Sequence, residues 1–184
     1  MSTLLTTIKN AFEQLNLDFV DYKLQENYPF DRLKLVFGQD YKERPIIIHL
    51  TAFEQSQLKQ LKQMIASEAS FDRLQIIYEF PFSLEEKQGD NIANLILFIN
   101  TLLDIPGFEV DLFHKRIRFR TVQVYGKQEL DVQSLLGIIG TIFLYLETYM
   151  STIENVNSGK TTFLEVLQQV LEISEKMSEK FSKE

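Results

Sequence analysis

The stretch Ser158-Gly159-Lys160-Thr161-Thr162 is similar to the end of a phosphate-binding loop. Such a loop needs a glycine five residues before the Gly-Lys pair, so that successive backbone amides can wrap the phosphate. The sequence has Glu154 at that place, and a carboxylate there would repel the ligand. A helical pattern also precedes the stretch where the motif requires a strand. We therefore interpret it as a helix end followed by the cap of the next helix.

The two histidines, His49 and His114, lie far apart in the sequence. Neither belongs to a spacing that brings metal ligands together on one helix face, and the chain has no cysteine to supply a thiolate. We expect His49 to be a structural residue of an apolar strand and His114 to lie in a solvated turn. The sequence thus predicts no metal site, because ligands would have to come from distant segments.

Other catalytic patterns are also missing from the sequence. It contains no Gly-x-Ser-x-Gly elbow to expose a nucleophile and no Gly-x-Gly-x-x-Gly loop for a dinucleotide. The paired carboxylates Glu85 and Glu86 fall at a predicted helix entrance, where exposed amides favour negative charge. We predict that the protein is not an enzyme, with no catalytic residues and no cofactor.

Three arginines, Arg116, Arg118 and Arg120, alternate with Ile117 and Phe119. On a strand the arginines share one face while the two apolar residues point to the core. One interpretation is that the arginines pair with acids of a neighbouring strand, such as Glu109 or Asp111, and the many acidic residues favour it. The other is a docking surface for an acidic segment or an anion, since arginine binds carboxylates through two hydrogen bonds. These three arginines are the candidate partner-binding residues.

Composition limits the class of protein. A chain of 184 residues with 45% hydrophobic residues suits one domain, or one domain with an added element. The net charge of −7 disfavours nonspecific binding to nucleic acid or to an anionic membrane. The most apolar stretch, Leu135 to Leu146, is shorter than the roughly 20 residues of a membrane span. The absence of cysteine and of a signal-peptide pattern favours a cytoplasmic location.

Hydrophobic periodicity predicts the elements that must position these residues. Helices are expected at 3–15, 55–67, 84–103, 132–156 and from about 161 to the end; strands at 32–37, 45–53, 73–80, 108–112 and 116–125, with a weaker one at 23–28. Thr162 and Glu165 have the spacing of a capping box for the last helix.

This order predicts an α+β fold with a bent antiparallel sheet and helices packed on one side. We expect one domain over residues 1–159 and an appended helix of the same unit over 160–184. Gly137 and Gly140 lie nearly on one face of a long helix and would admit a close neighbour. The apolar stripe of the last helix, which ends at Phe181, also needs a neighbour. For both features a helix of the same chain is favoured over a second subunit.

The segment from Leu95 to Val156 resembles the YbjN family of bacterial proteins. The resemblance is carried, in order, by Leu95-Ile96-Leu97-Phe98-Ile99-Asn100, Pro106-Gly107-Phe108-Glu109-Val110-Asp111, Ile117-Arg118-Phe119-Arg120 and Tyr149-Met150-Ser151-Thr152-Ile153-Glu154-Asn155-Val156. Agreement is looser back to Leu15. The predicted helix at 55–67 and the helix after Gly159 depart from the family pattern.

The resemblance implies a fold like that of type III secretion chaperones, with helices on a strongly bent antiparallel sheet. Proteins of that fold commonly dimerise and hold extended segments of a client, and family members are described as sensory-transduction regulators. It implies a non-enzymatic bacterial adaptor, regulatory or chaperone-like, that binds a protein client or partner. Two alternatives remain open: a small-molecule sensor or enzyme whose pocket joins distant residues, and a purely structural homodimer.

Overall fold

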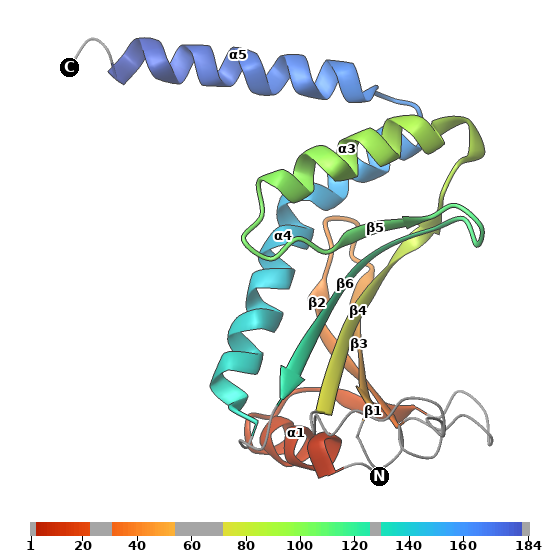
Figure 1. The fold of residues 1–184 in the computed structure, drawn as a ribbon, viewed down its shortest axis with the longest axis vertical. Helices are drawn as coiled ribbons and strands as arrows, with labels where there is room; N and C mark the ends of the chain where they lie inside the picture. The colour runs from red at the N-terminus through yellow and green to blue at the C-terminus, as the bar shows by residue number, and fades with distance from the viewer. Residues whose placement is uncertain (1–2, 23–30, 54–71, 126–129, 182–184) are drawn as a thin grey trace, which may run out of the picture. The chain divides into compact units, whose positions relative to one another are not determined.

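The structure, a computed structural model, describes residues 3–22, 31–53, 72–125 and 130–181 (Figure 1). Its strands form one six-stranded antiparallel sheet in the order β1-β2-β3-β4-β6-β5. Their bounds are β1 Phe19–Tyr22, β2 Arg32–Gln39, β3 Pro45–Phe53, β4 Asp72–Ser83, β5 Phe108–Asp111 and β6 Arg116–Tyr125. The α-helices of the described residues are α1 Thr3–Gln14, α3 Gly89–Thr101, α4 Val132–Asn157 and α5 Phe163–Phe181. The predicted α+β class and antiparallel sheet are confirmed.

The chain divides into two compact units. The first contains residues 1–81 and 118–147, and the second contains residues 82–117 and 148–184. Strands β4 and β6 and helix α4 therefore each contribute to both units. The expected division into residues 1–159 and 160–184 stays a prediction.

In the first unit, one face of the sheet carries the hydrophobic core. Aromatic rings join this face to two helices. Phe37 of β2 lies 5.2 Å from Phe143 of α4 between ring centroids, and Phe12 of α1 lies 6.0 Å from Phe19 of β1. The strand residues of the face are fully or almost fully buried: Leu33, Leu35, Ile46, Ile48, Leu50, Ala52, Leu74, Ile76, Tyr78, Phe80 and Phe119. Alternation along the strands produces this face, as the sequence predicted.

In the second unit, two asparagine side chains replace backbone hydrogen bonds where elements end. The Asn100 side-chain oxygen accepts from the amides of Gly107 and Phe108, and its Nδ2 donates to the Phe108 carbonyl at 2.9 Å. Asn157, which is buried, accepts from the Glu85 amide at 3.0 Å and donates to the Ser83 carbonyl at 2.9 Å. Buried backbone groups need such partners, so each asparagine stabilises the chain path beside it.

Most predicted elements are confirmed, and the start of one helix is wrong. The strand at 45–53 and the helices that start at residues 3 and 132 lie where they were expected. Strand β1 was not predicted, because only four residues pair. The helix expected to start at Leu84 begins at Gly89, since β4 continues to Ser83 and a 3-10 turn covers Glu86–Gln88. Glu85 thus precedes that turn and Glu86 is its first residue. The predicted elements at 23–28 and 55–67 lie outside the described residues.

Helix α4 spans Val132–Asn157, as predicted for residues 132–156. Its 26 residues extend beyond the apolar stretch Leu135 to Leu146, and by length and composition the helix could cross a membrane. The core helix of a soluble protein meets the same test, and α4 directs Leu135, Ile139 and Ile142 into the core. Among the described residues the expected close neighbour at its glycines is not found, because a Cβ at Gly137 or Gly140 would meet none of their atoms within 4 Å.

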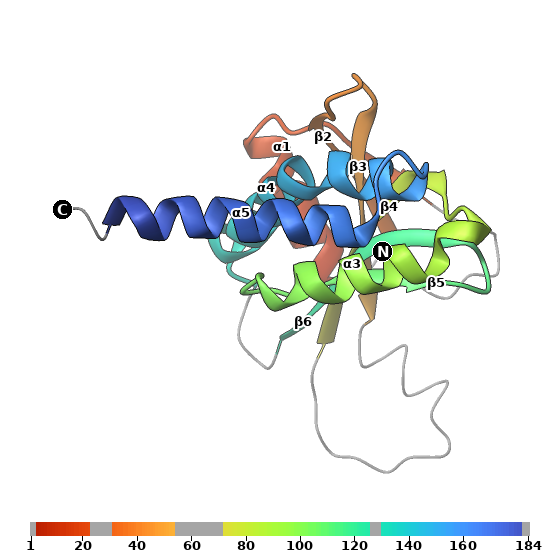
Figure 2. The same cartoon turned by 90° about the horizontal axis from the view of Figure 1, so that it is seen from above.

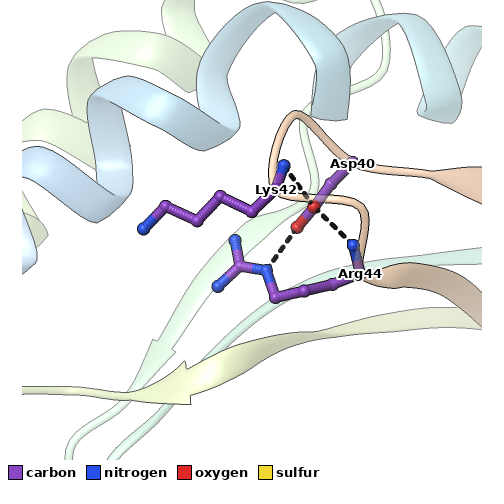
Figure 3. Close-up of polar contacts among 3 residues, drawn as sticks. All are labelled: Asp40, Lys42 and Arg44. Carbon is purple, nitrogen blue, oxygen red and sulfur yellow. Dashed lines mark hydrogen bonds and ion pairs between the residues drawn. The ribbon is translucent and has the colours of Figure 1, made fainter.

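The turn between β2 and β3 is organised by Asp40 (Figure 3). Its carboxylate accepts hydrogen bonds from the Lys42 amide at 2.8 Å, the Arg44 amide at 3.0 Å and the Arg44 Nε at 2.6 Å. The Asp40 side chain is only 2% exposed. Burial alone would raise the pKa of Asp40, but these hydrogen bonds and the charge of Arg44 outweigh it and lower that pKa.

Replacement of Asp40 by Asn should destabilise the protein by about 1–3 kcal/mol at neutral pH, because the turn loses a charged acceptor. A lowered folded-state pKa contributes stability above the unfolded value, near pH 4, which is lost as the pH falls through the folded value. The wild-type free energy of unfolding should therefore fall more steeply below about pH 4 than that of Asp40→Asn. Urea denaturation across pH 3–7 measures both effects. The exposed Asp104→Asn is the control, and equal acid dependence of wild type and Asp40→Asn would contradict this role.

Candidate protein-binding surface on the sheet

Cross-strand pairing in the first unit arranges the residues of β2, β3 and β4 in rows. Arg32 pairs with Thr51, which pairs with Gln75. Lys34 pairs with His49 in the next row. Directly opposed residues of an antiparallel sheet point to the same face. By strand alternation each of these rows lies on the face opposite the hydrophobic core, and Thr51 in the first row is itself buried.

This opposite face collects positive charge. Five cationic residues of the first unit alternate along their strands with buried core residues, and we call the surface that carries them the cationic face. They are Arg32, Lys34, Arg73, Arg118 and Arg120. Within the described strands of this unit, Glu79 is the one acidic residue at these positions. The protein as a whole has a net charge of −7, so this concentration of cations is local.

The cationic face also exposes apolar side chains. Val20 is 59% exposed and Val124 is 61% exposed, and Val36 and Val122 are exposed as well. Val20 pairs directly with Lys34 across β1 and β2, so the apolar and cationic side chains are interleaved. A surface that mixes exposed apolar groups with arginine has the composition of protein-binding surfaces.

The three candidate arginines alternate with the core as predicted. Ile117 and Phe119 are buried, while Arg116 is exposed and Arg118 and Arg120 are half-buried. Arg116 belongs to the second unit, and only Arg118 and Arg120 belong to the first. All three arginines make further interactions within the chain, as do Glu109 and Asp111. Their pairing with those two acids stays a prediction.

His49 reports the electrostatics of the cationic face. It is half-buried on β3, opposite Lys34. Burial lowers the pKa of His49, and the charges of Lys34 and Arg32 lower it further, against the opposing effect of Glu79. An imidazole whose charged form is disfavoured by neighbouring cations lies in a region of positive potential.

Arg73 extends the cationic face toward the end of β3. Its guanidinium lies 5.8 Å from the centroid of the Phe53 ring, an arrangement in which the ring attracts the cation. Its Nε is buried, and this donor has no hydrogen-bond acceptor in the described structure. A buried donor without an acceptor costs free energy.

The stretch similar to a phosphate-binding loop is a helix end followed by a cap, as expected. Gly159 has a φ of 71°, and the amides of Gly159 and Lys160 donate to the carbonyls of Val156 and Asn155. This is the hydrogen-bond pattern of a Schellman motif. The Glu165 carboxylate accepts from the Thr162 amide at 2.7 Å, which confirms the capping box.

The two histidines belong to no metal-binding group in the described part of the chain. His114 is exposed in the β5–β6 turn and contacts Asp111 at 2.7 Å, as expected for a solvated turn residue. No group of three or more His, Asp or Glu residues that could hold a metal is found among the described residues. His49 and His114 lie in different units.

Sequence reasoning missed most of the cationic face. It named Arg118 and Arg120 but did not connect them with Arg32, Lys34 and Arg73. The alternation of Arg32 and Lys34 with Leu33 and Leu35 was a usable signal. The register that places them in rows with β3 and β4 was not available from the sequence.

No protein-family model matches this sequence, and no curated protein matches it. The resemblance to the YbjN family and to the type III secretion chaperone fold therefore stays a prediction.

Replacement of Lys34 by Gln should raise the pKa of His49, because a cation directly opposite the imidazole is removed. An NMR titration of the His49 imidazole measures the change. Lys42→Gln, in the exposed β2–β3 turn, should leave that pKa unaltered. If Lys34→Gln also left it unaltered, the positive potential assigned to this face would be wrong.

Proposed function

We propose that the protein is a non-enzymatic adaptor, regulatory or chaperone-like, that binds an acidic segment of another protein on the cationic face. The observation that carries the proposal is the grouping of five cations and four exposed valines on one side of the sheet, with one acid among them. The arginines also make contacts within the chain. The proposal therefore depends on the grouping of these residues and not on any one arginine.

The chemistry of this surface defines its partner. Arginine side chains bind carboxylates through two parallel hydrogen bonds, which favours Asp or Glu in the partner. The exposed valines Val20 and Val124 would be covered by apolar side chains of the same segment. Complementary charge also speeds association and excludes basic segments. We therefore expect a partner segment in which acidic and apolar residues alternate.

The resemblance to the YbjN family supports the same proposal, because the fold that it implies holds extended client segments. The resemblance places the protein in bacteria, and on its composition and charge we propose a cytoplasmic location with no membrane insertion and no nucleic-acid partner. A homodimer is compatible with this function.

Charge reversal of the cationic face should abolish partner capture. Arg118→Glu combined with Arg120→Glu replaces two attractive contacts by repulsive ones, and we expect recovery of the specific partner to fall at least about tenfold. The measurement is affinity capture from native lysate of the source cells, with a photo-crosslinking residue at position 124 to report contact at the face.

The matched control is Lys87→Glu combined with Lys160→Glu, which makes the same change in net charge at exposed positions of the second unit. This control should retain the partner and its crosslink at position 124. Equal capture by the folded Arg118→Glu, Arg120→Glu variant, or a partner that never crosslinks at position 124, would contradict the proposal.

A further inference from the structure

His49 lies on an inner strand of the cationic face. Strand β3 lies between β2 and β4 in the sheet of the first unit (Figures 1 and 2). The register places His49 directly between Lys34 of β2 and Ile77 of β4. Its neighbours along β3, Ile48 and Leu50, are buried in the core. The half-buried imidazole therefore lies on the same side of the sheet as the Lys34 side chain.

The charged groups around this imidazole come from the strands on both sides. Strand β2 contributes Lys34, directly opposite, and Arg32, one row away, while β4 contributes Glu79. Strand β3 itself has no other charged residue. Burial and then the two cations lower the pKa of His49, and Glu79 opposes them. The imidazole is therefore mostly uncharged at neutral pH in the free protein.

A carboxylate bound to Lys34 would change the charge of His49. Directly opposed side chains of antiparallel strands have Cβ atoms about 4.5–5.5 Å apart, so one carboxylate can contact both the Lys34 ammonium and the imidazole. A negative charge within about 4–6 Å favours the protonated imidazole and raises its pKa. By linkage, protonation of His49 and binding of an acidic segment then stabilise each other.

We propose that His49 makes the cationic face bind acidic segments more tightly as the pH falls. The inference rests on the proposed function, because it concerns the regulation of the same surface. Imidazole is the side chain whose charge ordinarily changes between about pH 5 and 8. Its protonation adds a sixth positive charge to the face, in the row of Lys34. Since one imidazole takes up one proton, the affinity changes by at most about tenfold per pH unit.

The test is the affinity of the full-length protein for a synthetic peptide of alternating glutamate and leucine, measured by calorimetry at constant salt and at pH 7.5 and 5.5. The peptide carboxylates stay largely ionised over this range. Wild type should bind about threefold to tenfold more tightly at the lower pH. An NMR titration of the wild-type imidazole should give a higher pKa for His49 with the peptide bound than without it.

Three variants assign the effect to one side chain. His49→Gln removes the titratable ring, so the gain in affinity between pH 7.5 and 5.5 should disappear. His49→Lys carries its charge at both pH values and should also show no gain. The chain has only two histidines, and the other lies in the second unit. His114→Gln is therefore the matched control, and it should keep the wild-type gain.

The outcomes separate this inference from the proposed function. Peptide binding that is equally tight at both pH values in wild type, or a pKa of His49 that does not rise on binding, would overturn the inference alone. A gain that survives in His49→Gln would assign the effect to another group and would also overturn it. No peptide binding at either pH would remove the proposed function, and this inference with it.

Discussion

Antiparallel pairing of β2, β3 and β4 is the constraint on which the other features of the first unit depend. Each cross-strand pair points to one face, so the register that buries Leu33 beside Leu50 also places Lys34 beside His49. A slip of one residue would exchange the two faces and bury cations in the core. The strand register that the hydrophobic core requires thus also determines which residues lie on the cationic face. The free energy of core burial stabilises that register and so keeps the cations on this face.

Concentration of positive charge on one face has a cost, because like charges repel. Burial lowers the pKa of His49 most, and the charges of Lys34 and Arg32 lower it further against the opposing charge of Glu79. Valines such as Val20 lie between the cations and expose apolar surface to water, which is unfavourable. A bound acidic segment would relieve both effects at once. Helix α5 also exposes apolar side chains, among them Ile173 and Met177.

Local pattern was enough to predict β3, α4 and the Thr162–Glu165 cap, because each depends on residues close in sequence. Strand β1 was missed because four residues give little periodicity, and a contact from Lys9 of α1 to Asp21 at 2.5 Å contributes to its position. The predicted start of α3 was wrong because the chain before it is held by a distant residue. The Asn157 side chain hydrogen-bonds to the backbone of Ser83 and Glu85, which lie 74 and 72 residues away in the sequence. Only part of the cationic face was predicted, because strand register brings together residues that are as far apart in the sequence as Arg32 and Arg120.

The central claim, that the cationic face binds acidic segments, is tested most directly by an NMR titration with a synthetic peptide of alternating glutamate and leucine. The account predicts saturable shifts at Lys34, His49, Arg73 and Arg120, which weaken as salt is raised. It also predicts no response to the matching peptide of alternating lysine and leucine. Shifts confined to the second unit, equal responses to both peptides, or no response to the acidic peptide would contradict it.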